Sequence, residues 1–372
     1  MKIRFARWAI VLLIFHLAPI QAPAKELDWK PEKTWLFVVG VLSWKNSDMF
    51  GSFPVKNRRD VALVDFFKEN GVPDSQIVYL QDQKATQQRI DNAFTEQLKK
   101  LRPDDLLIVY YAGHGTKSED GNDVYLASYD AGDDVEGWSI NSIPGKIKES
   151  KGSRVLWFID CCYSGQAALA ITKQSSGPAY ACVTSSAASE SSTEHWTFTE
   201  ALLDALRGVS YVDLNHDGAI TLAEFAAHVE ADMNAAEEQR ATFASTKGFD
   251  PGMVLARAET PATPRIGERA KARDSYGDWY ACRIIDARDG KLKIHFIGYE
   301  DDEDMWVGPE DLRPITPVRY ATGTKVEVLW KKQWYPATVL QAKDGSHLIH
   351  YIDYESKWDE WVPSRRIREP KS

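Results

Sequence analysis

Short apolar segments alternate with amphipathic segments along the first two thirds of the chain. Five segments rich in Val, Ile and aromatic residues are expected as strands, at residues 34–44, 76–81, 105–115, 154–165 and 180–186. Stretches with a helical period lie between them, for example residues 58–70 and 85–101. Strands that alternate with helices indicate a mostly parallel sheet sandwiched by helices. We therefore expect one α/β domain over residues 25–258.

The pattern changes after a short Thr/Pro-rich linker at residues 259–265. Short strand-like pieces, aromatic residues and Asp-Gly turns follow, and they occur twice. Trp279-Tyr280 returns as Trp334-Tyr335, an offset of 55 residues that the later matches share. Two copies of one module are therefore predicted, at 266–316 and 321–370, each a small SH3-like β-barrel.

Composition and the amino terminus suggest an exported globular protein. The chain has 372 residues, a hydrophobic fraction of 44% and a net charge of −9, which argues against broad nucleic-acid binding. Residues 1–24 resemble a signal peptide, with basic residues first, then an apolar run and the small-residue end Ala22-Pro23-Ala24. The alternative is an uncleaved anchor. No later segment could span a bilayer, so we expect a secreted or periplasmic protein.

The four cysteines do not form a good disulfide framework. Cys161 and Cys162 are neighbours and cannot pair without strain. Cys182 and Cys282 lie within apolar runs, where a free thiol behaves as a small hydrophobic group. The adjacent pair therefore calls for a chemical explanation.

Two strand ends bring together residues suited to nucleophilic catalysis. His114 follows one expected strand, in YYAGHG, and the cysteines follow the next, in WFIDCCYSG. Both segments should emerge at the carboxyl edge of a parallel sheet, where ligands bind. A thiol nucleophile requires a nearby imidazole and backbone N–H donors, and Gly115 leaves the backbone beside His114 accessible.

These two motifs resemble the caspase-like cysteine peptidases, and most closely the metacaspase branch, over roughly residues 33–257. The resemblance implies Cys162 as nucleophile and His114 as general acid/base. It also implies an oxyanion hole formed by the N–H groups of Gly115 and Cys162. Because side chains alternate along a strand, Cys161 should point the opposite way, into the core.

The resemblance also implies carboxylates in a substrate pocket. Asp160 corresponds to the metacaspase pocket carboxylate, which would pair with Arg or Lys before the scissile bond. Asp60 resembles a second one, although ordinary charge at a helix start explains it equally well. Arg58 and Arg59 leave open the opposite substrate preference, for Asp before the scissile bond.

Two positions depart from the metacaspase pattern. Ala112 stands where Ser is frequent, and Tyr163 stands where His is usual. These departures bear on which substrate the site accepts more than on the catalytic chemistry.

Residues 213–224, DLNHDGAITLAE, match a twelve-residue EF-hand loop. The candidate Ca²⁺ ligands are Asp213, Asn215, Asp217, Ala219 through its carbonyl, and Glu224. A single unpaired loop leaves open a turn that keeps the shape and binds metal weakly or not at all.

The carboxyl-terminal copies resemble chromo-barrel and Tudor-like domains, which often hold methylated lysine in an aromatic cage. By register the cage of the second copy would be Tyr351, Tyr354 and Trp358, with Trp361 in the core. In the first copy Glu303 replaces the third aromatic residue. The plainer interpretation is a pair of barrels that dock on a peptide or a surface.

The sequence therefore predicts an exported cysteine endopeptidase with a possible Ca²⁺ loop and two targeting barrels. The alternative is a catalytically silent caspase-like scaffold for two ligand-binding barrels.

Overall fold

A computed structural model describes residues 26–56, 58–188, 195–259, 265–315, 320–330, 333–343 and 346–370. The expected signal peptide, residues 1–24, and most of the expected linker lie outside the described residues. Within the described ranges, no helix is both long enough and apolar enough to cross a membrane.

A six-stranded sheet forms the centre of the larger domain, with strand order β10-β8-β7-β3-β1-β2. Its members are β1 (Thr34–Gly40), β2 (Ile77–Gln81), β3 (Leu106–Ala112), β7 (Arg154–Asp160), β8 (Ala179–Thr184) and β10 (Thr242–Ser245). All neighbours pair in parallel except β10, which is antiparallel to β8. The predicted mostly parallel sheet is confirmed, and β10 is an edge strand that the pattern did not predict.

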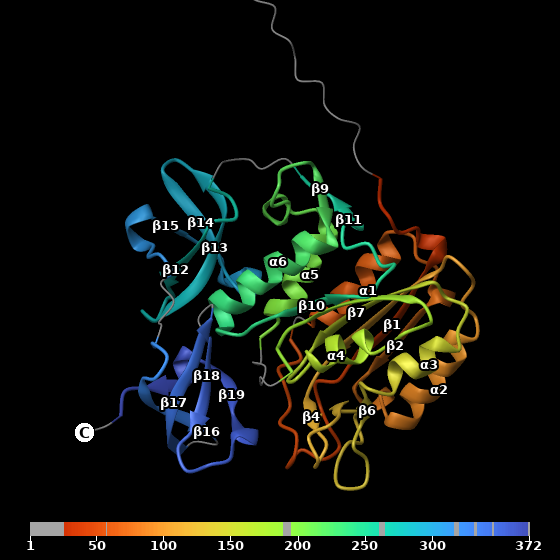
Figure 1. Cartoon of the computed structure of the whole chain (residues 1–372). Helices are drawn as coiled ribbons and strands as arrows, with labels where there is room; N and C mark the ends of the chain where they lie inside the picture. Colours follow the sequence, from red (N-terminus) through yellow and green to blue (C-terminus); the bar gives the residue numbers. More distant parts are fainter. Residues whose placement is uncertain are drawn as a thin grey trace, which may run out of the picture.

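Helices cover both faces of this sheet (Figure 1). One face packs against α1 (Arg59–Glu69), α5 (Thr197–Arg207) and α6 (Leu222–Asp232), and the other against α2 (Gln87–Leu98), α3 (Ile143–Lys148) and α4 (Gln166–Thr172). Within β7, Leu156 and Phe158 enter the first core, whereas Val155, Trp157 and Ile159 enter the second. This alternation explains why central strands are apolar throughout.

Two small antiparallel sheets complete the larger domain. The first consists of β4 (Gly115–Lys117), β5 (Val124–Leu126) and β6 (Trp138–Ser139). The second pairs β9 (Ala219–Thr221) with β11 (Val254–Arg257).

The internal repeat forms two antiparallel sheets with matching irregularities. Repeat 1 contains β12 (Arg269–Arg273), β13 (Trp279–Arg288), β14 (Lys291–Phe296) and β15 (Met305–Val307). Repeat 2 contains β16 (Lys325–Trp330), β17 (Gln333–Lys343), β18 (Ser346–Tyr351), β19 (Glu360–Pro363) and β20 (Ile367–Arg368). The register shifts between Ile284 and Asp286 in repeat 1 and between Val339 and Gln341 in repeat 2, again 55 residues apart.

Repeat 1 docks on the larger domain through a buried ion pair beside α6 (Figure 1). Asp232 is only 2% exposed and pairs with Arg269 and Arg283. Burial alone would raise the pKa of Asp232, but the Arg283 charge holds this pKa well below its usual range. Removing one partner of a buried pair costs far more than removing a surface pair, so this contact fixes repeat 1 firmly.

Repeat 2 also contacts the larger domain. The Arg240 guanidinium lies 3.9 Å from the centre of the Trp361 ring. Trp361 is half-buried at this contact, so its predicted place in the barrel core is wrong.

Candidate active site

The site lies at the carboxyl edge of the central sheet. In the sheet, β2 lies on one side of β1, at the edge, and β3 lies on the other side of β1. This reversal is a topological switch point, where an open α/β sheet leaves a crevice beyond its strand ends. Residues 41–58 follow β1, and Gly113 begins the segment after β3.

His114 is held by aromatic rings and by one backbone carbonyl. Its ring centre lies 4.5 Å from that of Trp44 and 4.4 Å from that of Phe53. Its Nε2 lies 2.9 Å from the Gly51 carbonyl oxygen. A carbonyl only accepts hydrogen bonds, so this contact favours a proton on Nε2 and leaves Nδ1 as the basic nitrogen of the neutral ring.

The two adjacent cysteines have different environments, as strand alternation predicts. Cys161 is 1% exposed and joins the same core as Trp157 and Ile159. Burial raises the pKa of the Cys161 thiol well above its ordinary value, so this sulfur is a poor nucleophile. Cys162 is partly exposed, and Tyr163 after it has a positive φ of 59°, which makes the turn toward α4 sharp.

Gly115 shows directly that the His114 and Cys162 segments meet. A Cβ atom added to Gly115 would lie 2.1 Å from the Cys162 carbonyl oxygen and 3.0 Å from the Cys161 Sγ. Gly113 N–H also donates to the Asp160 carbonyl at 3.2 Å. The backbones of the two sequence motifs, 48 residues apart in the chain, are thus in direct contact.

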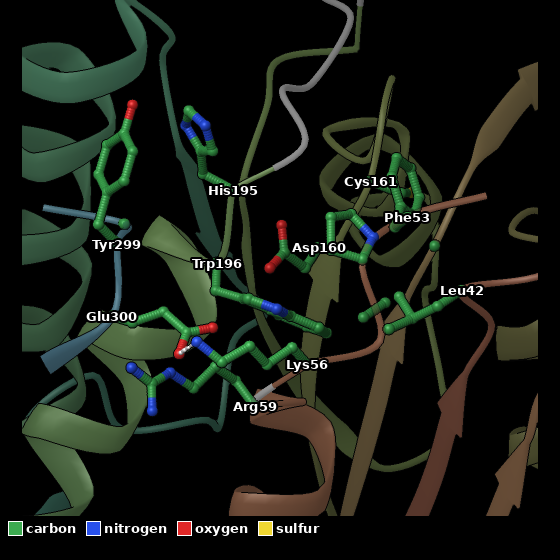
Figure 2. Close-up of a pocket in the computed structure, with 14 residues that line it drawn as sticks. Leu42, Phe53, Lys56, Arg59, Asp160, Cys161, His195, Trp196, Tyr299 and Glu300 are labelled. Atoms are coloured by element: carbon green, nitrogen blue, oxygen red, sulfur yellow. Dashed lines mark ion pairs between the residues drawn. The ribbon is translucent and has the colours of Figure 1, made fainter. Parts of the chain in front are cut away.

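A cavity of about 220 Å³ opens beside this contact (Figure 2). Its walls come from the segments that follow β1, β3 and β7, from the starts of α1 and α5, and from repeat 1. The lining residues are Leu42, Phe53, Pro54, Lys56, Arg59, Ala112, Gly113, Asp160, Cys161, His195, Trp196, Gly298, Tyr299 and Glu300.

Asp160 supplies an anionic group to this cavity, as predicted, and in Figure 2 its carboxylate projects toward the open space. Its Oδ2 accepts a hydrogen bond from Thr199 Oγ1 at 2.7 Å, and Thr199 also contacts the Tyr110 hydroxyl. Burial raises the pKa of Asp160 to about 6. No Lys or Arg side chain of the described residues forms an ion pair with Asp160, so the cavity presents an uncompensated carboxylate near neutral pH.

Asp60 does not line the cavity, and its predicted role in a substrate pocket is wrong for this structure. It is fully buried, and both its oxygens accept hydrogen bonds from Arg58, at 3.0 and 2.8 Å. The Tyr79 hydroxyl donates to it as well, at 2.7 Å. Arg58 in turn binds Asp82 and the Gly40 carbonyl. Asp60 and Arg58 neutralise each other inside the protein, so neither charge is available to a substrate.

The EF-hand-like loop has the expected turn but not a gathered ligand set. Gly218 has a φ of +85°, and its N–H donates to Asp213 Oδ2 at 2.9 Å. Glu224 caps α6 instead: its Oε2 accepts from the Thr221 N–H at 2.9 Å. Among the described residues, the carboxylates of Asp213, Asp217 and Glu224 do not all come within 4.8 Å of one another. The loop residues suit Ca²⁺ in type and order, and the Glu224 Oε1 already reaches the loop, where it accepts from the Asn215 N–H at 3.3 Å.

The aromatic cluster of repeat 2 differs from the predicted cage. Tyr335 lies 6.1 Å from Tyr351 and 6.2 Å from Tyr354, measured between ring centres, and Trp330 lies 5.9 Å from Tyr335. Tyr351 and Tyr354 therefore belong to the cluster. Trp358 is 53% exposed and makes no ring contact with these tyrosines in the described part of the chain, so its place in the cage stays a prediction.

The His114 and Cys162 segments thus meet at the carboxyl edge of an α/β sheet, beside a cavity that Asp160 lines. The family model described as "Caspase domain" matches residues 57–250, more than half of the chain. The chain belongs to this family of cysteine peptidases. A second model, the Tudor-knot, described as "RNA binding activity-knot of a chromodomain", matches residues 320–369, which is repeat 2.

Solved structures offer weaker similarity. The "Crystal structure of Tbtudor" matches at 23% identity and a TM-score of 0.14, covering 14% of this chain and 100% of that one. A crystal structure of protein GSU0716 from Geobacter sulfurreducens matches at 14% identity and a TM-score of 0.44, covering 61% of this chain and all of the other. The comparison with curated proteins found no match.

Proposed function

We propose that the protein is a cysteine endopeptidase that cleaves after Arg or Lys. One observation carries the proposal. The His114 and Cys162 segments touch at Gly115, beside a cavity that contains the uncompensated carboxylate of Asp160. A thiol and an imidazole on adjoining segments, beside a cavity with an anionic wall, suit hydrolysis next to a cationic side chain.

The chemistry follows from these positions. The His114 Nδ1 takes the proton of the Cys162 thiol, and the thiolate attacks the peptide carbonyl. The Gly51 carbonyl accepts from the Nε2–H and thereby stabilises the imidazolium that forms. The N–H groups of Gly115 and Cys162 would stabilise the oxyanion. His114 then protonates the leaving amine, and water hydrolyses the thioester.

The surrounding charges support a basic rather than an acidic preference. Arg58, which could have directed the pocket toward Asp, is fully engaged by Asp60 and Asp82. Arg59 pairs with Glu200 at 3.1 Å. Asp160 is left as the charge that a substrate side chain can neutralise.

Selectivity for arginine should depend on the ionisation of Asp160. Citrulline has nearly the shape of arginine without its charge. The Cys/His pair acts on both peptides, so its titration cancels in the ratio of kcat/KM for the arginine peptide to kcat/KM for the citrulline peptide. Because the pKa of Asp160 is about 6, this ratio should rise by about tenfold between pH 5 and pH 7. Asp160→Asn should lower the ratio at pH 7 and remove its dependence on pH.

Fluorogenic peptides that end in Arg, citrulline, Lys and Asp would test both points in reducing buffer. A preference of the wild type for cleavage after Asp would leave the Cys/His assignment intact and would overturn the assignment of Asp160 to the substrate pocket. No hydrolysis of any peptide by the folded chain would favour the silent scaffold.

We also propose that the loop at residues 213–224 binds Ca²⁺. Glu224→Gln keeps the helix cap, because a glutamine side chain can also accept from the Thr221 N–H, but it loses the carboxylate charge. We expect calorimetry with CaCl₂ to show at least about tenfold weaker binding by this variant. Glu230→Gln on the exposed face of α6 is the control and should bind as the wild type does. Equal binding by both variants would contradict the assignment.

The remaining proposals concern location and the barrels. The leader-like segment supports export to a secreted or periplasmic location. The Tudor-knot match indicates a binding role for repeat 2. Its cluster of Trp330, Tyr335, Tyr351 and Tyr354 could dock a peptide or surface ligand that presents a cationic or apolar group. The acidic composition of repeat 1 makes nucleic acid an unlikely ligand for that copy.

A further inference from the structure

The cavity has one wall that does not belong to the peptidase domain. Gly298, Tyr299 and Glu300 of repeat 1 line it together with Asp160 and Trp196 (Figure 2). These residues begin the segment between β14 and β15, residues 298–304, which we name the acidic loop because five of its seven residues are Asp or Glu.

Glu200 on α5 anchors the acidic loop to the peptidase domain. One of its oxygens lies 3.1 Å from Arg59, and the other accepts from the Gly298 N–H at 3.0 Å and lies 3.2 Å from His295 Nε2. Gly298 has a φ of +86°, and a Cβ there would lie 2.3 Å from Thr197 Oγ1. The backbone approach is therefore too close for any other residue.

His295 strengthens this anchor as a cation. It lies between Glu200 and Asp304, whose oxygen is 2.8 Å from its Nδ1. Burial alone would lower the pKa of His295, but the two carboxylates raise it to about 9. The ring therefore carries a positive charge at neutral pH. Together with the buried Asp232 pair described above, it makes the acidic loop a fixed wall rather than a mobile lid.

The acidic loop also reverses the charge at the mouth of the cavity. Without repeat 1, Lys56 would repel an incoming arginine, whereas Arg59 would still be paired with Glu200. Lys56 Nζ lies 3.5 Å from Glu300 and 3.4 Å from Asp302, and Arg59 lies 3.6 Å from Asp301. Repeat 1 thus neutralises Lys56 and adds a second carboxylate beside Arg59, which Glu200 of the peptidase domain already pairs.

Glu300 has hydrogen-bonding capacity that the protein does not use. Its Oε2 is buried and accepts no well-aligned hydrogen bond from the described residues. The Lys56 ammonium lies 3.5 Å from this same oxygen, at the long limit of a hydrogen bond, and the Lys56 side chain is 70% exposed. A buried carboxylate oxygen without a donor is costly, and a guanidinium that displaced the Lys56 ammonium would supply the missing donors.

We propose that Glu300 of repeat 1 is the second carboxylate of the substrate pocket, acting with Asp160 to select an arginine side chain. This inference rests on the proposed peptidase function. It gives repeat 1 a role in specificity, because the peptidase domain alone would leave the Lys56 ammonium unpaired at a pocket with a single uncompensated carboxylate, Asp160.

The test compares Glu300→Gln with Asp302→Asn in the whole chain. Both changes remove one negative charge near Lys56, but only Glu300 lines the cavity. Loss of a charge-assisted hydrogen bond should lower the arginine-to-citrulline ratio of kcat/KM by about tenfold in Glu300→Gln. Asp302→Asn should change this ratio by less than about twofold.

A binding measurement tests the inference independently of turnover. Cys162→Ala and its Glu300→Gln double variant would be titrated with N-acetyl-arginine amide by calorimetry, after thermal melting confirms folding. About tenfold weaker binding by the double variant supports the inference even if no peptide is cleaved. Hydrolysis after Arg that is equally selective in wild type and Glu300→Gln, with equal binding, would overturn it and leave the proposed function intact.

Discussion

Replacing Cys162 by alanine is expected to lower the rate of peptide hydrolysis by at least about 10⁴-fold, because it removes the nucleophile. Cys162 is the partly exposed member of the pair, and it stands at the contact with Gly115 that brings the two motifs together. Hydrolysis of a fluorogenic arginine peptide in reducing buffer measures the effect. Thermal melting should be nearly unchanged.

The matched control is Cys161→Ala. This sulfur is buried in the core and its pKa is raised, so its loss should leave turnover within several-fold of wild type. It should lower the free energy of unfolding by about 1 kcal/mol, as a small core deletion does. If Cys161→Ala were inactive and Cys162→Ala active, Cys161 and not Cys162 would be the nucleophile. Activity in neither the wild type nor the variants would favour the scaffold.

Periodicity was sufficient to predict the sheet and the burial of the Cys161 side chain. The apolar runs of β1, β3 and β7 fill both faces of one sheet, and the same alternation that buries Trp157 and Ile159 carries on to Cys161. The 55-residue repeat likewise predicted two copies of one module, and the structure adds a register shift at matching positions in both. These features depend on local sequence, which is why the pattern alone predicts them.

Pairing between distant side chains could not be predicted in the same way. The sequence shows that Arg58 and Asp60 are charged but not that they bind each other. Asp60 was therefore predicted to be a carboxylate of the substrate pocket, whereas it belongs to a buried ion pair. Gly51 acts through its carbonyl, a group that every residue has, so its identity gives no signal. Glu300 belongs to another domain, and only the docking of repeat 1 places it in the cavity.

Gly115→Ala should lower kcat/KM by about 100-fold or more while the chain remains folded. The added Cβ would lie 2.1 Å from the Cys162 carbonyl oxygen, a backbone atom that cannot rotate away. The two segments would have to separate by about 1 Å, and a displacement of that size at a reacting pair costs about two orders of magnitude in rate. Relieving the clash should also cost about 1–3 kcal/mol of stability, measurable by thermal melting.

Gly145→Ala is the control for this substitution, because a Cβ at Gly145 has no neighbour within 4 Å and the residue lies inside α3. Alanine there should preserve activity and raise stability by up to about 1 kcal/mol. A Gly115→Ala variant that folds and cleaves at the wild-type rate would show that the close contact between the two segments is not needed. The pairing of His114 with Cys162 would then have to be achieved without the backbone arrangement on which the proposed mechanism depends.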